Sequence, residues 1–383
     1  MTIPDSLTTP LTSRIVQTVQ AAGGWLGFDD FMAQALYTPG LGYYANDLRK
    51  LGLMPSSGSD FVTAPELSPL FGRALAAQVE QALQQTQTRE VWEFGAGSGA
   101  LALQLLDALG TRVARYTIVD VSGALRARQQ QALQKFGDQV RWVNALPPTL
   151  QGVVVGNEVL DAMPVKVLAR CGGVWHERGV AVRAEHVEAS STDAGQARPS
   201  APGAGGLVWQ DRPTELRPPL RIDGTHDYVT EIHPQAEAFM RTLADKLTQG
   251  AAFFIDYGFP EREYYHPQRH MGTVMCHRAH QADADPLADV GLKDITAHVN
   301  FTGVALAAQD AGLSVLGYAS QARFLLNCGL APMLEQVDLA ARAQASKLVM
   351  EHEMGELFKV IGLTAGDPWD ALGFAAGDRT HTL

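Results

Sequence analysis

The stretch Val91–Gly99, VWEFGAGSG, decides the fold of this chain, and an apolar run from Ala100 to Leu109 follows it directly. A short β-type segment gives way to three glycines at alternate positions, and apolar residues then recur at helical spacing. This order predicts a strand, a tight turn and the N-terminus of a helix. Gly95 and Gly97 allow a sharp turn and the close approach of a ligand, and the first helical turn offers unpaired N–H groups. The stretch is therefore interpreted as a nucleotide-type pocket.

Two classes of cofactor fit this loop. Gly95, Gly97 and Ala100 match the dinucleotide pattern G-x-G-x-x-G/A, and Asp120 follows about twenty residues later. With Glu93 included, the loop matches the E-x-G-x-G pattern that binds S-adenosylmethionine in methyltransferases. Glu93 favours the second class, because a carboxylate would repel a pyrophosphate but attract the ammonium and sulfonium groups of S-adenosylmethionine.

The composition sets limits on the other functions. The chain has 383 residues, enough for one large domain with insertions or for two domains, and its 46% hydrophobic and 19% charged residues are typical of a globular protein. A net charge of −11 argues against a nucleic acid as the main partner. Three widely spaced cysteines indicate reduced thiols. The N-terminus resembles neither a secretory signal nor a mitochondrial presequence, and no apolar run is long enough to span a membrane, so we expect a cytoplasmic protein.

Short apolar strands alternate with helices after the glycine-rich loop. The further strands are predicted at residues 115–121, 139–143, 152–160, 251–258 and 314–319, and the helices at 100–109, 125–136, 234–247 and 302–311. This alternation predicts an α/β fold with a parallel, doubly wound sheet. Ligands of such sheets bind at the carboxyl ends of the strands. Glu93, Asp120, Asn144 and residues 157–161 are therefore expected around one crevice.

Other segments surround this core. Helices are expected at 12–22, at 28–36 with Asp29 or Asp30 as the cap, and at 67–85, and residues 321–361 are expected to be mostly helical. Residues 166–188 suggest antiparallel strands around Gly172-Gly173, and 189–206 a flexible loop. The expected division is 1–88 (helices and a covering loop), 89–165 (cofactor core), 166–232 (inserted hairpins), 233–320 (second half of the core) and 321–383 (C-terminal helices).

Seven stretches in this order resemble the MidA/NDUFAF7-type class I methyltransferases, whose mitochondrial members assist the assembly of respiratory complex I. They are GSDFVTAPELSPLFG, EFGAGSGALA, YTIVDVSGALRARQ, GNEVLDAMPV, FFIDYGFP, GTVMCHRAH and DITAHVNFTGV. The resemblance implies a seven-stranded Rossmann-like sheet, S-adenosylmethionine as the cofactor and no metal. It also implies a protein acceptor, with arginine favoured, of the type found among respiratory-complex subunits. Asp120 stands where many relatives would carry Glu, which shortens its reach.

The cofactor would be held from several sides. Glu93, Gly95 and Gly97 would hold its methionine part, and Asp120 would accept hydrogen bonds from the ribose hydroxyls. The alternative for Asp120 is a helix-capping acid. Asn144, at the end of the third strand, is a further candidate.

Residues ahead of the sheet are expected to cover the cofactor. The resemblance assigns this role to Thr63 and Pro65, together with Glu66, Tyr43 and Tyr44. The alternative is that Thr63 and Glu66 form only a capping box for the following helix, because S/T-x-x-E is its signature.

The acceptor side is expected at residues 157–164. Asn157 offers an amide and a carbonyl, and it is counted with both the cofactor-binding and the catalytic candidates. Glu158 would hold a guanidinium bidentately and make one nitrogen more nucleophilic, with Asp161 as the second choice. The alternative is that Asn157 and Asp161 only cap the turn before Met163-Pro164.

Three functions are compatible with these patterns. The first is an S-adenosylmethionine-dependent methyltransferase acting on a protein side chain. The second is a cofactor-binding assembly factor that works mainly through protein interaction. The third, a nicotinamide oxidoreductase, is disfavoured by Glu93. A zinc site is not expected, because the histidines and the cysteine of the segment 266–280 do not have the usual ligand spacing.

Overall fold

The computed structural model describes residues 9–46, 62–120, 122–183 and 206–383. The loop expected at 189–206 lies outside these residues apart from Gly206. The chain forms two compact units. The described part of unit 1 comprises residues 9–46, 164–183, 206–232 and 265–297, and that of unit 2 comprises 62–120, 122–163, 233–264 and 298–383. The expected segments 1–88 and 166–232 thus both contribute to unit 1.

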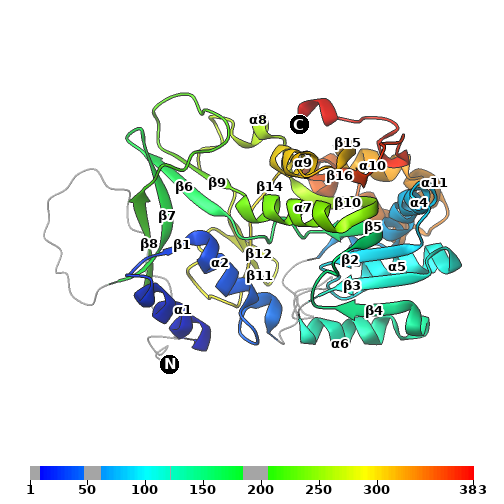
Figure 1. The fold of residues 1–383 in the computed structure, drawn as a ribbon, viewed down its shortest axis with the longest axis horizontal. Coiled ribbons are helices and arrows are strands. Elements are labelled where there is room, and N and C mark those ends of the chain that lie inside the picture. Colours follow the sequence, from blue (N-terminus) through cyan, green and yellow to red (C-terminus); the bar gives the residue numbers. More distant parts are fainter. Residues whose placement is uncertain (1–8, 47–61, 121, 184–205) are drawn as a thin grey trace, which may run out of the picture. The chain divides into compact units, whose positions relative to one another are not determined.

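Unit 2 is built on one long sheet (Figure 1). Its path runs β15-β16-β10-β5-β2-β3-β4, and the short strand β14 (Val299–Asn300) pairs with β10. The seven strands of the path are β2 (Glu90–Phe94), β3 (Arg115–Val119), β4 (Val140–Val143), β5 (Leu150–Asn157), β10 (Leu247–Phe259), β15 (Ser314–Ser320) and β16 (Phe358–Ala365). β4, β3, β2, β5 and β10 are parallel neighbours, and β16 runs antiparallel between β10 and β15. The predicted α/β fold with a seven-stranded sheet is confirmed.

Alternating side chains give this sheet two buried faces. In β10, Phe253 belongs to one apolar cluster and Phe254 to the other, as expected where successive residues of a strand point to opposite faces. The first cluster includes residues of α4 (Pro69–Gln85), α5 (Ala100–Leu109) and α10 (Gln321–Asn327). The second includes residues of α7 (Pro234–Lys246) and α9 (Phe301–Asp310). The remaining helices of unit 2 are α3 (Ala64–Leu67), α6 (Gly123–Ala132), α8 (Glu261–Tyr264), α11 (Leu330–Glu335) and α12 (Leu339–Ser346).

The expectation of mostly helical structure at 321–361 is confirmed by α10, α11, α12 and a further helical segment at Glu351–Gly355, and it is wrong only from Phe358, where strand β16 begins. Its residues are buried along almost their whole length and pair with β10 and β15. The sequence FKVIGLTA has no polar alternation, because both faces of the strand are covered. Its periodicity therefore could not distinguish this strand from a buried helix.

The helix expected at 67–85 is interrupted, and this prediction was wrong at its start. It is two helices, α3 and α4, separated at Ser68. Pro69 disfavours helical geometry at the residue before it, and the Ser68 Oγ accepts a hydrogen bond from the Leu70 N–H at the start of α4.

The described part of unit 1 contains antiparallel sheets and two α-helices. Helix α1 (Pro10–Ala21) precedes strand β1 (Leu26–Gly27), and helix α2 (Phe28–Tyr37) follows it. Strand β7 (Val174–Val182) pairs with β1, β6 (Lys166–Cys171) and β8 (Leu207–Pro213). Strand β9 (Tyr228–Ile232) pairs with β6. Gly172 and Gly173 both have positive φ, 55° and 84°, and form the hairpin turn predicted between β6 and β7. The predicted Asp caps of α2 are wrong, because Gly27 is the N-cap and Asp29 instead pairs with Lys166.

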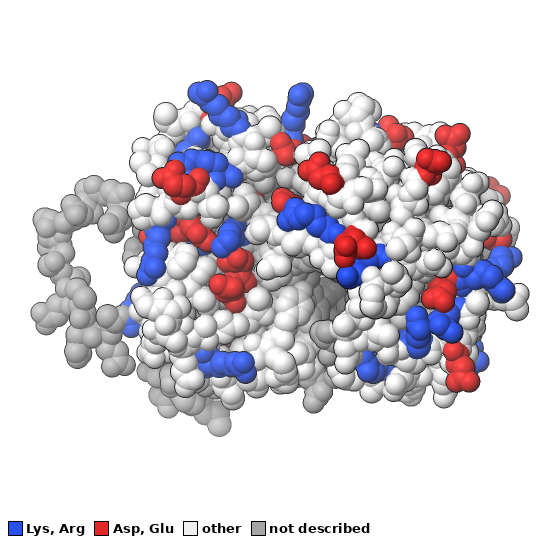
Figure 2. Space-filling view, in the orientation of Figure 1, with Lys and Arg blue, Asp and Glu red and all other residues white. Residues whose placement is uncertain are grey.

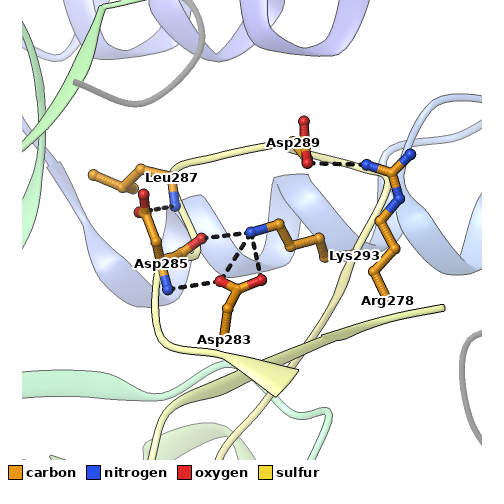
Figure 3. Close-up of polar contacts among 6 residues, drawn as sticks. All are labelled: Arg278, Asp283, Asp285, Leu287, Asp289 and Lys293. Carbon is orange, nitrogen blue, oxygen red and sulfur yellow. Dashed lines mark hydrogen bonds and ion pairs between the residues drawn. The ribbon is translucent and has the colours of Figure 1, made fainter. Parts of the chain in front are cut away.

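The buried side chain of Lys293 binds acidic residues in the last segment of unit 1, within residues 275–296. β11 (Met275–Arg278) pairs with β12 (Gln281–Asp283) and β13 (Asp294–Thr296). The Lys293 Nζ lies among acidic residues and donates to both carboxylate oxygens of Asp283, at 2.9 and 2.8 Å, and to the Asp285 backbone oxygen (Figure 3). Arg278 pairs with Asp289 in the same loop. The ammonium group thus neutralises the central carboxylate of an acidic loop.

Charged side chains of both signs are interspersed on the face drawn in Figure 2. Among the described residues, no helix has the length and apolar character needed to cross a membrane.

Candidate cofactor and acceptor site

The predicted strand, turn and helix are confirmed in unit 2. β2 ends at Phe94, α5 begins at Ala100, and residues 95–99 between them form what we call the cofactor loop. Gly95, Gly97 and Gly99 have positive φ values of 62°, 53° and 88°, a region that L side chains rarely occupy.

The end of β5 lies directly beside this loop. Phe94 of β2 pairs with Gly156 of β5, and residues 157–161, here called the acceptor turn, follow. A Cβ added to Gly95 would lie 3.0 Å from Cγ2 of Val159 in that turn. Because the two strands are parallel, their carboxyl ends open at one edge of the sheet, where ligands of α/β folds bind.

Asp120 is linked to the cofactor loop through Gln129 of α6. The Gln129 Nε2 donates to Oδ2 of Asp120 at 2.8 Å and to the backbone oxygen of Gly97 at 3.0 Å. The Trp142 Nε1 donates to Oε1 of the same glutamine. The helix cap here is Ser122, whose N–H also donates to Oδ1 of Asp120. Asp120 is therefore not the cap of α6.

Glu93 is buried on the sheet face next to the loop. It is 2% exposed, and the Tyr116 hydroxyl donates to its Oε2 at 2.7 Å. Burial raises the pKa of Glu93 to about 8; the Tyr116 hydrogen bond opposes this rise and the nearby Asp120 charge adds to it. A cation bound near this carboxyl would favour its ionised form.

The segment ahead of the sheet contacts the cofactor loop. The Ser98 hydroxyl donates to Glu66, and the Gln104 Nε2 donates to the Pro65 backbone oxygen at 2.8 Å. Thr63 is the N-cap of α3, but its side chain makes no capping hydrogen bond. The capping-box alternative is therefore wrong.

Three other candidates have partners of their own. The Asn144 Oδ1 accepts a hydrogen bond from Arg126 of α6. Tyr43 is fully buried in unit 1, and the Tyr44 hydroxyl donates to Asp294 in the same unit. The expectation that these tyrosines cover the cofactor stays a prediction.

Asp256, in the last third of β10, holds the acceptor turn. Its Oδ2 accepts three backbone hydrogen bonds, from Val159 at 3.1 Å, Leu160 at 2.8 Å and Asp161 at 3.2 Å. Burial, together with the charges of Asp161 and Glu158, raises the pKa of Asp256 well above its usual range. The turn is therefore capped mainly by Asp256, which comes from another strand, and the Asp161 carboxyl adds backbone hydrogen bonds with Ala162 and with its own N–H.

The acceptor turn carries unsatisfied polar atoms. Glu158 has a positive φ of 53°, an unusual value for a residue with a side chain, and its Oε1 accepts from the Asn157 Nδ2 at 3.0 Å. Oδ1 of Asn157 and Oδ1 of Asp161 are buried and have no hydrogen-bond partner among the described residues. Burial raises the pKa of Asp161 to about 6, although the Tyr257 side chain hydrogen-bonds its carboxyl. A strained residue beside unpaired acceptors is typical of a ligand site.

The structure brings most of the candidates together within unit 2. Six of them lie at or just after the carboxyl ends of the adjacent strands β2 and β5: Glu93, Gly95, Gly97, Asn157, Glu158 and Asp161. Asp120 is linked to the cofactor loop through Gln129. Sequence analysis missed Gln129, Gln104 and the holding role of Asp256. A glutamine within a helix carries no signal of such a role. In the described parts of the chain, no group of three His, Cys, Asp or Glu side chains is arranged to hold a metal ion.

The Asp256 contacts predict a specific stability result. Asp256→Ala should lower the free energy of unfolding by about 3 kcal/mol or more, because four N–H groups lose their acceptor: those of Val159, Leu160 and Asp161, which donate to Oδ2, and that of Tyr257, which donates to Oδ1. Asp256→Asn should cost less, because the amide oxygen can still accept the three bonds made to Oδ2 and the raised pKa makes the neutral residue the closer mimic. Chemical denaturation of both variants is the measurement. Equal losses in the two variants would contradict this account.

The fold and this site define a class I methyltransferase. Three features place the protein in this class: the strand order of the sheet, the glycine-rich loop after the first core strand β2, and the acid Asp120 after the second core strand β3. Comparison with known proteins agrees. A family model described as "Putative S-adenosyl-L-methionine-dependent methyltransferase" matches residues 71–319. The chain belongs to this family, and S-adenosylmethionine is its cofactor.

Individual relatives are similar along most of the chain. A methyltransferase-type protein from Burkholderia thailandensis, crystallised with S-adenosyl-homocysteine, is 45% identical with a TM-score of 0.88, and the match covers 100% of both chains. Protein arginine methyltransferase NDUFAF7, mitochondrial, from Danio rerio is 27% identical over 93% of this chain and 86% of that protein. The Homo sapiens protein of the same name is 25% identical over 84% of this chain and 74% of that protein.

The residues present fit this cofactor. The cofactor loop exposes backbone at Gly95, where a Cβ would meet Val159, and a buried carboxyl of raised pKa lies beside it at Glu93. Asp120 offers carboxylate oxygens that are already oriented by Ser122 and Gln129. These residues would hold the methionine part and the ribose hydroxyls, respectively.

Proposed function

We propose that this methyltransferase acts on an arginine side chain of a protein. The observation that supports this most directly is a pair of buried acceptor atoms in the turn that carries Glu158: Oδ1 of Asn157 and Oδ1 of Asp161 receive no hydrogen bond from the described residues. A guanidinium group has five N–H donors and no acceptor, so it complements such a set. The names of the relatives, which are protein arginine methyltransferases, support the same acceptor.

The chain's own residues would orient the acceptor and take its proton. S-adenosylmethionine supplies an electrophilic methyl group on sulfur. Glu158 would hold the guanidinium with two parallel hydrogen bonds and direct one nitrogen toward that methyl. The nitrogen gains the N–CH₃ bond, the S–CH₃ bond breaks with its electrons left on sulfur, and one N–H proton must leave. Asp161, whose pKa of about 6 keeps it mostly ionised at neutral pH, would accept this proton.

Two measurements test this proposal in sequence. Calorimetric titration with S-adenosylmethionine and then S-adenosyl-homocysteine is expected to show saturable binding. Cell extract incubated with the protein and a labelled methyl donor is then expected to yield labelled methylarginine in protein hydrolysate. Binding without any transfer would instead support an assembly factor that works through protein interaction. We further propose a cytoplasmic protein whose acceptor is a subunit of a respiratory-type complex, and identification of the labelled protein tests this.

Glu93 should make cofactor binding depend on pH. Below its pKa of about 8 the carboxyl is protonated and attracts no cation, so affinity for S-adenosylmethionine should rise from about pH 6 to about pH 9, by at most about tenfold per unit. Glu93→Gln should abolish this part of the rise. The cofactor's own titration is common to both proteins, so the ratio of their affinities isolates the carboxyl. Parallel pH profiles for the two proteins would rule out a contact between Glu93 and the cofactor.

A further inference from the structure

A pocket lies wholly within unit 1, and no residue of the cofactor loop or the acceptor turn lines it. It has a volume of about 450 Å³. Residues of β6, β7 and the segment 217–225 line it, including Arg170, Trp175, Arg217, Arg221, Ile222 and Asp223. Three arginines and one aspartate make its described lining positively charged, although the chain as a whole has a net charge of −11.

Arg170 is the buried centre of this pocket. The residue is only 5% exposed. Its Nη1 donates to the Ile222 backbone oxygen at 2.9 Å, and its Nε donates to the His226 backbone oxygen at 3.2 Å. Its Nη2 is buried and has no hydrogen-bond partner among the described residues. A buried guanidinium with an unpaired N–H group is costly unless something else binds it.

Aromatic rings hold this guanidinium in place. Its carbon lies 5.5 Å from the centre of the Trp175 ring and 5.7 Å from that of Tyr228. Such contacts stabilise the cation but supply no acceptor for the N–H groups. The guanidinium is therefore held in a fixed orientation, with Nη2 unpaired among the residues that the structure describes.

The other two arginines are exposed and also lack a carboxylate partner in the described structure. The Arg217 Nη1 donates to the backbone oxygens of Thr214 and Leu216. The pocket thus has N–H donors on the buried, fixed side chain of Arg170 and on the exposed side chains of Arg217 and Arg221. Trp175 and Ile222 supply apolar lining.

We propose that this pocket binds a small organic anion, a carboxylate or phosphate monoester with an apolar group. The anionic end would pair with Arg170 and be enclosed by Arg217 and Arg221, since planar guanidinium groups bind both anions through two parallel hydrogen bonds. The apolar group would lie against Trp175. Nothing in this proposal depends on which acceptor the methyltransferase uses.

Calorimetric titration of the full chain tests the proposal with phenyl phosphate, benzoate and inorganic phosphate as probes and benzyl alcohol as the uncharged control. We expect saturable binding of phenyl phosphate or benzoate, weaker binding of inorganic phosphate and none of benzyl alcohol. Which of the two aromatic anions binds more tightly identifies the preferred anionic group. Arg221→Gln should weaken binding about tenfold or more, because one charge-assisted contact is lost. Arg14→Gln, an exposed change elsewhere in unit 1, should leave it unchanged.

A second variant addresses the buried residue. Arg170→Lys keeps the charge but loses the planar pair of donors, so affinity for the aromatic anion should fall at least as far as in Arg221→Gln. Titration with S-adenosyl-homocysteine should be unchanged in Arg221→Gln, which checks that the cofactor site of unit 2 is unaffected, and an unchanged thermal unfolding profile checks that unit 1 is folded. The proposal is overturned if neither aromatic anion binds at ~10 mM, or if Arg221→Gln binds like the native protein.

Discussion

Exchanging Glu158 for Gln is expected to reduce methyl transfer about a hundredfold or more while leaving the affinity for S-adenosylmethionine nearly unchanged. The carboxylate belongs to the acceptor turn rather than to the cofactor loop, so its loss should affect the reaction and not cofactor binding. Gln cannot attract the positive charge of a guanidinium, and it would present an N–H group to a group that has only donors. Labelled methyl transfer and calorimetry, measured on the same preparation, separate the two effects.

The geometry of Glu158 makes this exchange a clean test. Its φ of 53° is equally unfavourable for Gln, so the substitution adds no backbone strain. The Asn157 Nδ2 can still donate to the side-chain oxygen of Gln. Glu215→Gln, at an exposed position of unit 1, is the matched control and should retain full turnover. Unimpaired transfer by Glu158→Gln would remove this residue from the mechanism and leave Asp161 as the candidate.

Asp120→Ala is expected to weaken S-adenosylmethionine binding by about a hundredfold or more. Two charge-assisted hydrogen bonds to ribose hydroxyls would be lost, each worth about 1.5–3 kcal/mol. The loss also frees Gln129, which links Asp120 to the Gly97 backbone oxygen. Both consequences act on the cofactor loop, so calorimetry should show the full effect.

Two further variants distinguish the direct contact from its support. Asp120→Glu restores the longer acid that the resemblance leads us to expect, and it should bind within about tenfold of the native protein. Gln129→Leu keeps the carboxylate but removes its link to the loop, so a smaller loss is expected. Full binding by Asp120→Ala would show that the ribose lies elsewhere. No binding even by the native protein would favour an interaction role or a site that a partner completes.

The sequence was sufficient to predict structure where a local residue pattern restricts the backbone directly. Alternating glycines between an apolar strand and an apolar helix permit little other than a turn, and residues 95–99 form one with three positive φ values. The hairpin at Gly172-Gly173 followed from the same conformational freedom. The placement of Glu93 and the acceptor turn at one edge followed from the parallel order of their strands.

The sequence was insufficient where the secondary structure or the hydrogen bonds of a segment depend on residues far away in the chain. β16 is a strand because it lies between β10 and β15, and its apolar run alone is equally compatible with a helix. Asp256 holds the acceptor turn from about a hundred residues away, a pairing that no spacing rule describes.

By itself, the sequence determined the class of this protein: a strand, a glycine turn and a helix that bind a nucleotide-type cofactor, with carboxylates after the neighbouring strands. Only the tertiary structure decided how those carboxylates behave. Burial raises the pKa of Glu93 to about 8 and of Asp161 to about 6, and no donor from the described part of the chain reaches the buried Oδ1 of Asn157. The physical reason is that desolvation and hydrogen-bond partners depend on which side chains meet in space, and a linear pattern does not contain that information.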